Sequence, residues 1–101
     1  MNISVSSELL SEVKNFLDIT WDDDAGDEKL SGIILRGMLR INEICGTEFD
    51  FSENGNALAK DLLLNYVIYA RSNALDEFMK NYQAEFNYLQ LTQEALNYVK
   101  S

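Results

Sequence analysis

Residues 57–101 read ALAKDLLLNYVIYARSNALDEFMKNYQAEFNYLQLTQEALNYVKS, and this stretch decides the fold. It contains no Gly and no Pro, the two residues that most disfavour a helix interior. Side chains three or four positions apart share one face of an α-helix, so the stretch predicts helix with a broad face that must be buried. The large apolar or aromatic residues at that spacing, with one polar interruption at Asn73, are Leu58, Leu62, Tyr66, Tyr69, Phe78, Tyr82, Phe86 and Leu89.

The weakest point of this pattern is Ser72–Asn73, because both side chains compete for nearby backbone groups. We expect a kink or a short break there, with one uninterrupted helix from Ala57 to Leu89 as the alternative. The final segment, residues 92–101, is expected to form a short helix or a mobile C-terminal arm.

A second amphipathic segment is predicted to form a helix over residues 27–45. Its N-cap is expected to be Asp24 or Asp27, and Gly46 supplies the left-handed residue that ends it. Gly37 lies inside the apolar stripe, where it costs about 1 kcal/mol relative to Ala. We interpret Gly37 as the point where a neighbouring helix crosses closely.

A further helix is predicted over residues 7–17, with Ser6 or Ser7 as its N-cap. Residues 47–56 form a turn-rich connection. The chain, residues 1–101, is therefore predicted as a single helical domain of the all-α class. We expect a small bundle of three to four helices, including a long helix in the C-terminal half, with short loops and no significant sheet.

Composition bounds the class of protein. Of the 101 residues, 47% are apolar and 25% charged, which is typical of a soluble globular domain. The longest apolar runs, Ile33–Leu35 and Leu62–Leu64, fall far below the roughly 20 residues of a membrane span. The N-terminal residues lack a basic region followed by a hydrophobic stretch, so we expect no secretory signal. The single Cys45 fits a reducing compartment and is expected to be a buried apolar residue.

The charge is strongly acidic, with 17 Asp and Glu against 8 Lys and Arg, a net charge of −9. Such a charge repels phosphate backbones and disfavours ordinary nucleic-acid binding. Two interpretations remain open: solubility at high concentration, or a surface that stays near nucleic acid without adhering to it. Composition alone does not separate them.

No pattern predicts chemistry. The chain has no His, and one Cys cannot supply a zinc site. The acidic loop Asp22–Glu28 fails the calcium-loop pattern, because counting from Asp22 puts Ile33 at the twelfth position, where Glu is required. We interpret its acids as helix caps. We expect no enzyme activity, no catalytic or metal residues and no cofactor.

The last third of the chain has more large rings than one buried face needs. Their helical spacing favours a core stripe, but Tyr and Phe are also enriched at protein interfaces, and a partly exposed aromatic face used for self-association is equally open. The residues predicted to contact other proteins are Trp21, Phe49, Phe51, Tyr82, Phe86, Tyr88, Leu96, Tyr98 and Val99.

Three segments, in their order and spacing, carry a family resemblance. The first is VKNFLDI at residues 13–19 with DDD at residues 22–24. The second is the helix that closes on CGTEFDF at residues 45–51. The third is DLLLNYVIYAR at residues 61–71, continued by NYQ and LQL within residues 81–91. Together they resemble the small head–tail connector proteins, also called adaptor or head-completion proteins, of tailed bacteriophages and prophages of Gram-positive hosts.

The resemblance implies an all-α structural protein that forms a ring, a dodecamer in the virion, beneath the portal protein. The ring would extend the DNA channel, let DNA pass without specific binding, and dock the next tail or stopper protein. Residues 92–101 would reach toward the portal. The protein would assemble in the bacterial cytoplasm, reside at the head–tail junction, and need neither membrane nor cofactor. Its state in isolation, monomer or oligomer, stays open. A closed ring of identical subunits requires two different contact faces on each subunit.

Two other functions compete with this one. A small acidic inhibitor that mimics DNA would place its carboxylates in the basic groove of a nucleic-acid enzyme, although the acids outside Asp22–Glu28 are scattered along the sequence. A helix-turn-helix DNA binder could use Arg36 and Arg40, but no basic cluster supports them.

Overall fold

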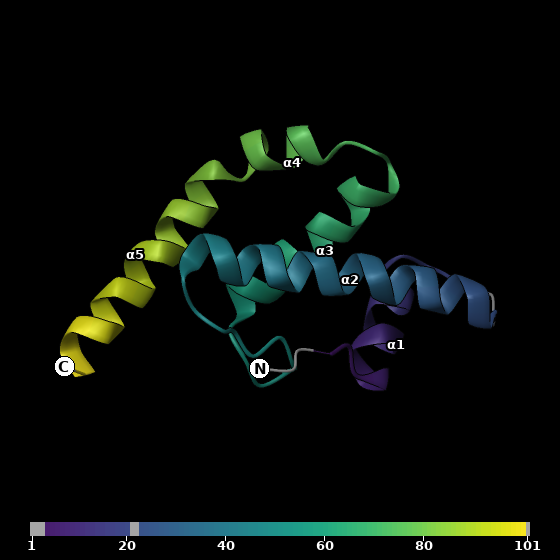
Figure 1. The fold of residues 1–101 in the computed structure, drawn as a ribbon, viewed down its shortest axis with the longest axis horizontal. Coiled ribbons are helices and arrows are strands. Elements are labelled where there is room, and N and C mark those ends of the chain that lie inside the picture. Colours follow the sequence, from purple (N-terminus) through teal and green to yellow (C-terminus); the bar gives the residue numbers. More distant parts are fainter. Residues whose placement is uncertain (1–3, 21–22, 101) are drawn as a thin grey trace.

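The computed structural model of the chain describes residues 4–20 and 23–100, the last four of these through their backbone only. Over these residues it is helical without strands, which confirms the all-α class (Figure 1). There are more helices than the three to four expected, because the C-terminal half is divided twice. The helices are α1 (Ser7–Phe16), α2 (Asp24–Cys45), α3 (Ala57–Arg71), α4 (Leu75–Asn81) and α5 (Gln83–Lys100).

α1 begins at Ser7, as predicted from the sequence. The Ser6 hydroxyl oxygen accepts a hydrogen bond from the Leu9 backbone N–H at 3.1 Å, so Ser6 is the N-cap. The helix buries Leu9 and Val13 in the core. It ends one residue before the predicted boundary, because the chain turns after Leu17 into a residue with positive φ.

α2 is longer at its start than predicted. Its N-cap is Asp23, whose carboxylate accepts from the Ala25 N–H at 3.2 Å, and the expected caps Asp24 and Asp27 both lie in the first helical turn. Consecutive acids offer equivalent capping groups, so the sequence does not single one out. The C-terminal end agrees with the prediction, because Gly46 has the left-handed φ of 62°.

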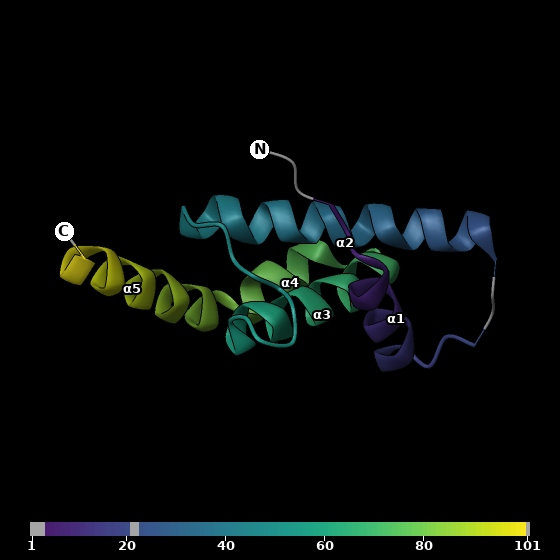
Figure 2. The same cartoon turned by 90° about the horizontal axis from the view of Figure 1, so that it is seen from below.

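α2 and α3 cross at Gly37, as predicted. A Cβ added at Gly37 would lie 2.7 Å from Tyr66 Cδ1 and 2.8 Å from Leu63 Cδ1, so only a residue without a side chain fits this contact. Figure 2 shows α2 lying along one side of a layer formed by the other helices. The core between them consists of Leu9, Val13, Leu30, Ile34, Met38, Ile41, Phe51, Ala59, Leu62, Leu63, Tyr66, Val67, Phe78, Phe86 and Leu89.

The long helical pattern breaks at the predicted point. α3 ends at Arg71, Asn73 adopts a positive φ of 55°, and the Ala74 N–H donates to the Tyr69 carbonyl at 2.8 Å. The alternative of one helix from residue 57 to 89 is therefore wrong. Asn tolerates the left-handed conformation better than most residues, which explains why the break falls there.

A second break at Tyr82 separates α4 from α5, and the sequence did not predict it. The two breaks bring the rings of the C-terminal half together. The Phe78 ring centroid lies 5.7 Å from those of Tyr66 and Tyr69, 5.1 Å from that of Tyr82 and 5.8 Å from that of Phe86. Most of the surplus rings thus pack on one another, because folding back lets α4 and α5 bury what a straight helix would expose.

The segment expected as a short helix or an arm is the second half of α5. The helix runs without interruption from Gln83 to Lys100, and its C-terminal half extends beyond the C-terminal end of α2 (Figure 1). The Cα extents of 46 × 27 × 21 Å reflect this elongation. None of the helices in the described part of the chain combines the length and apolarity needed to cross a membrane.

Candidate interaction surfaces

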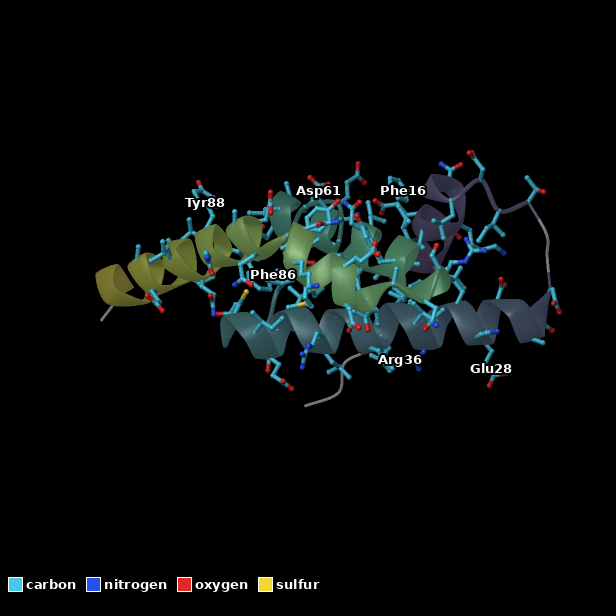
Figure 3. The ribbon with its side chains drawn as sticks, turned by 90° about the horizontal axis from the view of Figure 1, so that it is seen from above. Phe16, Glu28, Arg36, Asp61, Phe86 and Tyr88 are labelled. Carbon is cyan, nitrogen blue, oxygen red and sulfur yellow. The ribbon has the colours of Figure 1, made fainter. Side chains whose placement is uncertain are left out.

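Two of the predicted interaction residues are core residues. The exposed fraction of Phe86 is 2%, and Phe51 is buried as well. In Figure 3 the Phe86 side chain points from α5 toward α2. These two rings do not contribute to an outer surface, because the core stripe uses them.

Two more are half-buried. The Phe49 ring packs edge-on against Phe51, with centroids 6.1 Å apart, and its backbone N–H donates to the Asn42 side-chain oxygen at 3.0 Å. The Tyr82 hydroxyl donates to the Asn65 side-chain oxygen at 3.1 Å. Burial, with a smaller effect from Tyr69, raises the pKa of Tyr82. The Phe49 ring and the Tyr82 hydroxyl therefore both have partners within the chain itself.

Two of the remaining predicted interaction residues are exposed to solvent. Tyr88 is 62% exposed and Leu96 is 51% exposed, both on α5. Tyr98 and Val99 belong to the last turn of α5, and their side chains lie outside what the structure describes, as does all of Trp21.

Exposed apolar side chains gather along α5 from Tyr88 onward, on the projecting part of the helix and on the turn before it. Leu91, which the sequence analysis missed, is 64% exposed, and Ala95 is exposed too. Positions three and seven after Tyr88 lie close to it around a helix, a spacing that could have revealed Leu91 and Ala95, whereas Leu96 lies nearer the side of Leu89. We call Tyr88, Leu91, Ala95 and Leu96 the arm stripe. Figure 3 shows Tyr88 directed away from α2, opposite Phe86.

A hollow of about 370 Å³ lies between the start of α2 and the end of α3. Its lining, which we call the basic groove, is Gly26, Lys29, Leu30, Ile33, Ala70 and Arg71. Among the described residues its lining contains two cations and no carboxylate, which is unusual in a chain with net charge −9. Within the described residues Lys29 and Arg71 form no salt bridge, whereas Lys14, Arg40 and Lys60 each pair with an acid.

A second hollow, of about 480 Å³, has the opposite charge and is called the acidic hollow. It contains four carboxylates over an apolar floor, and one of them, Glu12, pairs with Lys60. Hydrogen bonds from Ser52 lower the pKa of Asp50 at its edge. Among the described residues no group of three acids or thiols converges as a metal site. The lining is Ser4, Ser6, Glu8, Leu9, Glu12, Met38, Phe49, Asp50, Phe51, Ser52, Glu53 and Asn54.

A third, shallower hollow follows the end of α2. Exposed Leu39 lies beside Glu43 and Glu48 there, so this surface is acidic as well. Cys45, close to the same end, is half-buried instead of fully buried, and burial raises the pKa of its thiol. A thiol with a raised pKa is a weaker nucleophile at neutral pH, which agrees with the packing role predicted for it.

Comparison of the chain with protein-family models, with curated proteins and with solved structures gave no match. The described surface thus includes an exposed apolar stripe on α5, one basic hollow and two acidic hollows.

Proposed function

We propose that this protein is a structural part of the head–tail connector of a tailed bacteriophage or prophage. It forms a ring beneath the portal protein, extends the DNA channel and presents a surface on which the next tail protein docks. The sequence resemblance supplies the assembly, and the fold is compatible with it: a small helical bundle with more than one kind of contact surface.

The observation that carries the proposal is the arm stripe. Three of its side chains, Tyr88, Leu91 and Leu96, are more than half exposed on a helix that projects from the bundle. Exposed apolar side chains that adjoin one another mark protein–protein contact, because leaving them in water costs free energy that a partner would recover. In the proposed ring this stripe is covered.

The charge fits a channel through which DNA slides. A wall with net negative charge repels the phosphate backbone and opposes adhesion. The carboxylates of Glu8, Asp50 and Glu53 are the described candidates for such a wall, because they surround one hollow. Replacing all three with their amides would keep the shape and reduce the repulsion, and we expect slower DNA ejection from the resulting particles.

Mixing the purified protein with portal protein tests the assembly. We expect a joint particle in sedimentation velocity, and we expect the double change Tyr88→Ser and Leu91→Ser to weaken it. The matched control is Asn87→Ser, an exposed position on the same helix beside the stripe. Absence of a joint particle with wild-type protein, under conditions where the portal is assembled, contradicts the proposal.

The DNA-mimic inhibitor gains one observation from the structure. Residues distant in the sequence, Glu8 and Glu12 on α1 and Asp50 and Glu53 in the loop before α3, bring their carboxylates to a single hollow. This function requires capture of a nuclease or polymerase with inhibition of that enzyme, and loss of inhibition on amide substitution at the hollow. The connector remains the better proposal, because the mimic gives the arm stripe no role.

A further inference from the structure

We propose that the arm stripe of one copy packs into the basic groove of the next copy, so that subunits join head to tail. This inference deepens the proposed ring and rests on it, since it names the two surfaces through which neighbouring subunits would meet. The occupant of the groove is a second copy of this chain.

The two surfaces lie at opposite ends of the molecule. The arm stripe begins beside the end of α2, where Gln90 donates to the Ile44 carbonyl, and continues along the part of α5 that extends past it, whereas the basic groove is formed by the first turns of α2 and the last turn of α3 (Figure 1). Contact between two different surfaces is heterologous, and it repeats from copy to copy until the rotation closes a ring. Within one chain the arm points away from the groove, so a single copy leaves both unfilled.

The apolar side chains of the basic groove and of the arm stripe are complementary in size. The groove presents half-buried Ile33 and Ala70 beside its cations, and the stripe presents Leu91 and Ala95 one turn apart. A ridge with a small residue next to a large one suits a groove between two helices, because ridges pack into grooves at helix contacts.

Charge favours this groove over the two acidic hollows. Glu94 lies at the edge of the stripe, three residues after Leu91, and it is the only charged residue of positions 88–96. Lys29 and Arg71 have no acid of their own chain in salt-bridge distance among the described residues, so they are available to Glu94 of a neighbour. The acidic hollow and the hollow beside Leu39 would instead repel that carboxylate.

Reversing the charges tests the contact. One variant carries Glu94→Lys and the other carries Lys29→Glu with Arg71→Glu, all at exposed positions where folding is not at risk. Each variant alone places like charges at every contact, and we expect its self-association constant to fall about tenfold or more. A 1:1 mixture restores an opposite pair at every contact in an alternating chain, so association should recover. The control Glu77→Lys, exposed on α4, should leave it unchanged.

Disulfide trapping extends the test to weak association. In a Cys45→Ser background, Ala95→Cys together with Ala70→Cys should give a ladder of cross-linked oligomers on oxidation, alone at high concentration or with portal protein. Ala95→Cys together with Glu77→Cys is the matched control. A ladder that forms equally fast in the control, or no ladder under either condition, overturns the inference.

The outcomes separate this inference from the proposed function. A joint particle with portal that ignores the charge reversals overturns the arm-to-groove contact and leaves the connector standing. Cross-linking of Ala95→Cys to portal instead of to a second copy has the same meaning. Binding of duplex DNA at low salt that is lost on Lys29→Glu with Arg71→Glu assigns the groove to nucleic acid and also overturns the inference.

Discussion

The two halves of α5 contain the same kinds of side chain in different surroundings. In the first half, Phe86 and Leu89 are 2% and 1% exposed, covered by the bundle. In the second half, Leu96 continues the same face seven residues after Leu89, yet half of its surface is exposed. The difference lies in the neighbouring elements: α2 ends at Cys45, and no helix in the described part of the chain covers α5 beyond that point (Figure 1).

This comparison shows what an apolar pattern does and does not determine. Spacing places residues on one face of a helix, but only the tertiary structure decides whether that face meets the same chain or a different one. In α5 the face of the first half that contains Phe86 and Leu89 contributes to folding, whereas the opposite face, with Tyr88, and the second half are left for assembly. Substitutions at the buried and at the exposed positions of α5 should therefore separate into those that lower stability and those that lower association.

The largest separation is expected between two aromatic residues of α5 that point in opposite directions (Figure 3). Phe86→Ala removes a buried ring that contacts Phe78, and we expect it to lower the free energy of unfolding by about 3–5 kcal/mol. Tyr88→Ala removes an exposed ring and should change it by less than about 0.5 kcal/mol. Urea unfolding followed by circular dichroism measures both. Equal losses would mean that the stripe is part of the fold.

Leu89 and Leu96 provide the next pair, at equivalent positions one heptad apart. Leu89→Ala should cost about 2–5 kcal/mol through lost burial and a cavity. Leu96→Ala should leave the unfolding midpoint nearly unchanged and instead weaken binding to portal protein or to a second copy, which sedimentation would detect. A large loss of stability for Leu96→Ala in the isolated chain would show that the arm folds back onto the bundle.

Much of the fold could be predicted, because its causes are local. Gly46 and Gly37 could be assigned to a helix end and a crossing from their residue type, and the N-cap of α1 could be narrowed to Ser6 or Ser7; the structure has Gly46, Gly37 and Ser6 in these roles. The break after Arg71 was also foreseen. The break at Tyr82 was not, because it arises from the packing of Phe78 on rings of α3, and no residue at positions 80–84 disfavours helix strongly enough to reveal it.

Less of the candidate site could be predicted, because exposure depends on distant segments. Phe51, Phe86, Tyr88 and Leu96 have similar apolar character, and only the path of α2 and α3 decides which are buried. The basic groove could not be predicted from the sequence either. Lys29 and Arg71 are 42 positions apart in the sequence, and only the crossing of α2 and α3 brings them to one hollow. For this reason the strongly acidic composition gave no indication of a cationic surface.

Substitutions at two glycines of α2 test how closely α2 packs against α3 at their crossing. Gly37→Ala should destabilise the chain by about 1–3 kcal/mol, because its Cβ would collide with Tyr66 and Leu63 in a packed core. Gly32→Ala is the matched control: its Cβ would meet only the Arg36 guanidinium at 3.4 Å, so the gain in helix propensity, about 1 kcal/mol, should dominate. Thermal unfolding would show opposite shifts. Stabilisation by both would mean that α2 can move away from α3.

The smallest effect is expected at the boundary between the two halves of α5. The Gln90 side-chain N–H donates to the Ile44 carbonyl oxygen at 2.7 Å, joining α5 to the last turn of α2. Because carbonyls at a helix end lack a partner within the helix, Gln90→Ala should cost about 1 kcal/mol. Gln93→Ala removes the same side chain one turn further on, where the structure gives it no hydrogen bond, and should be close to neutral. Chemical unfolding of both variants gives the difference. If Gln93→Ala proves as costly as Gln90→Ala, the bundle reaches further along α5 than the exposure of Leu91 and Leu96 indicates, and the arm begins later than residue 91.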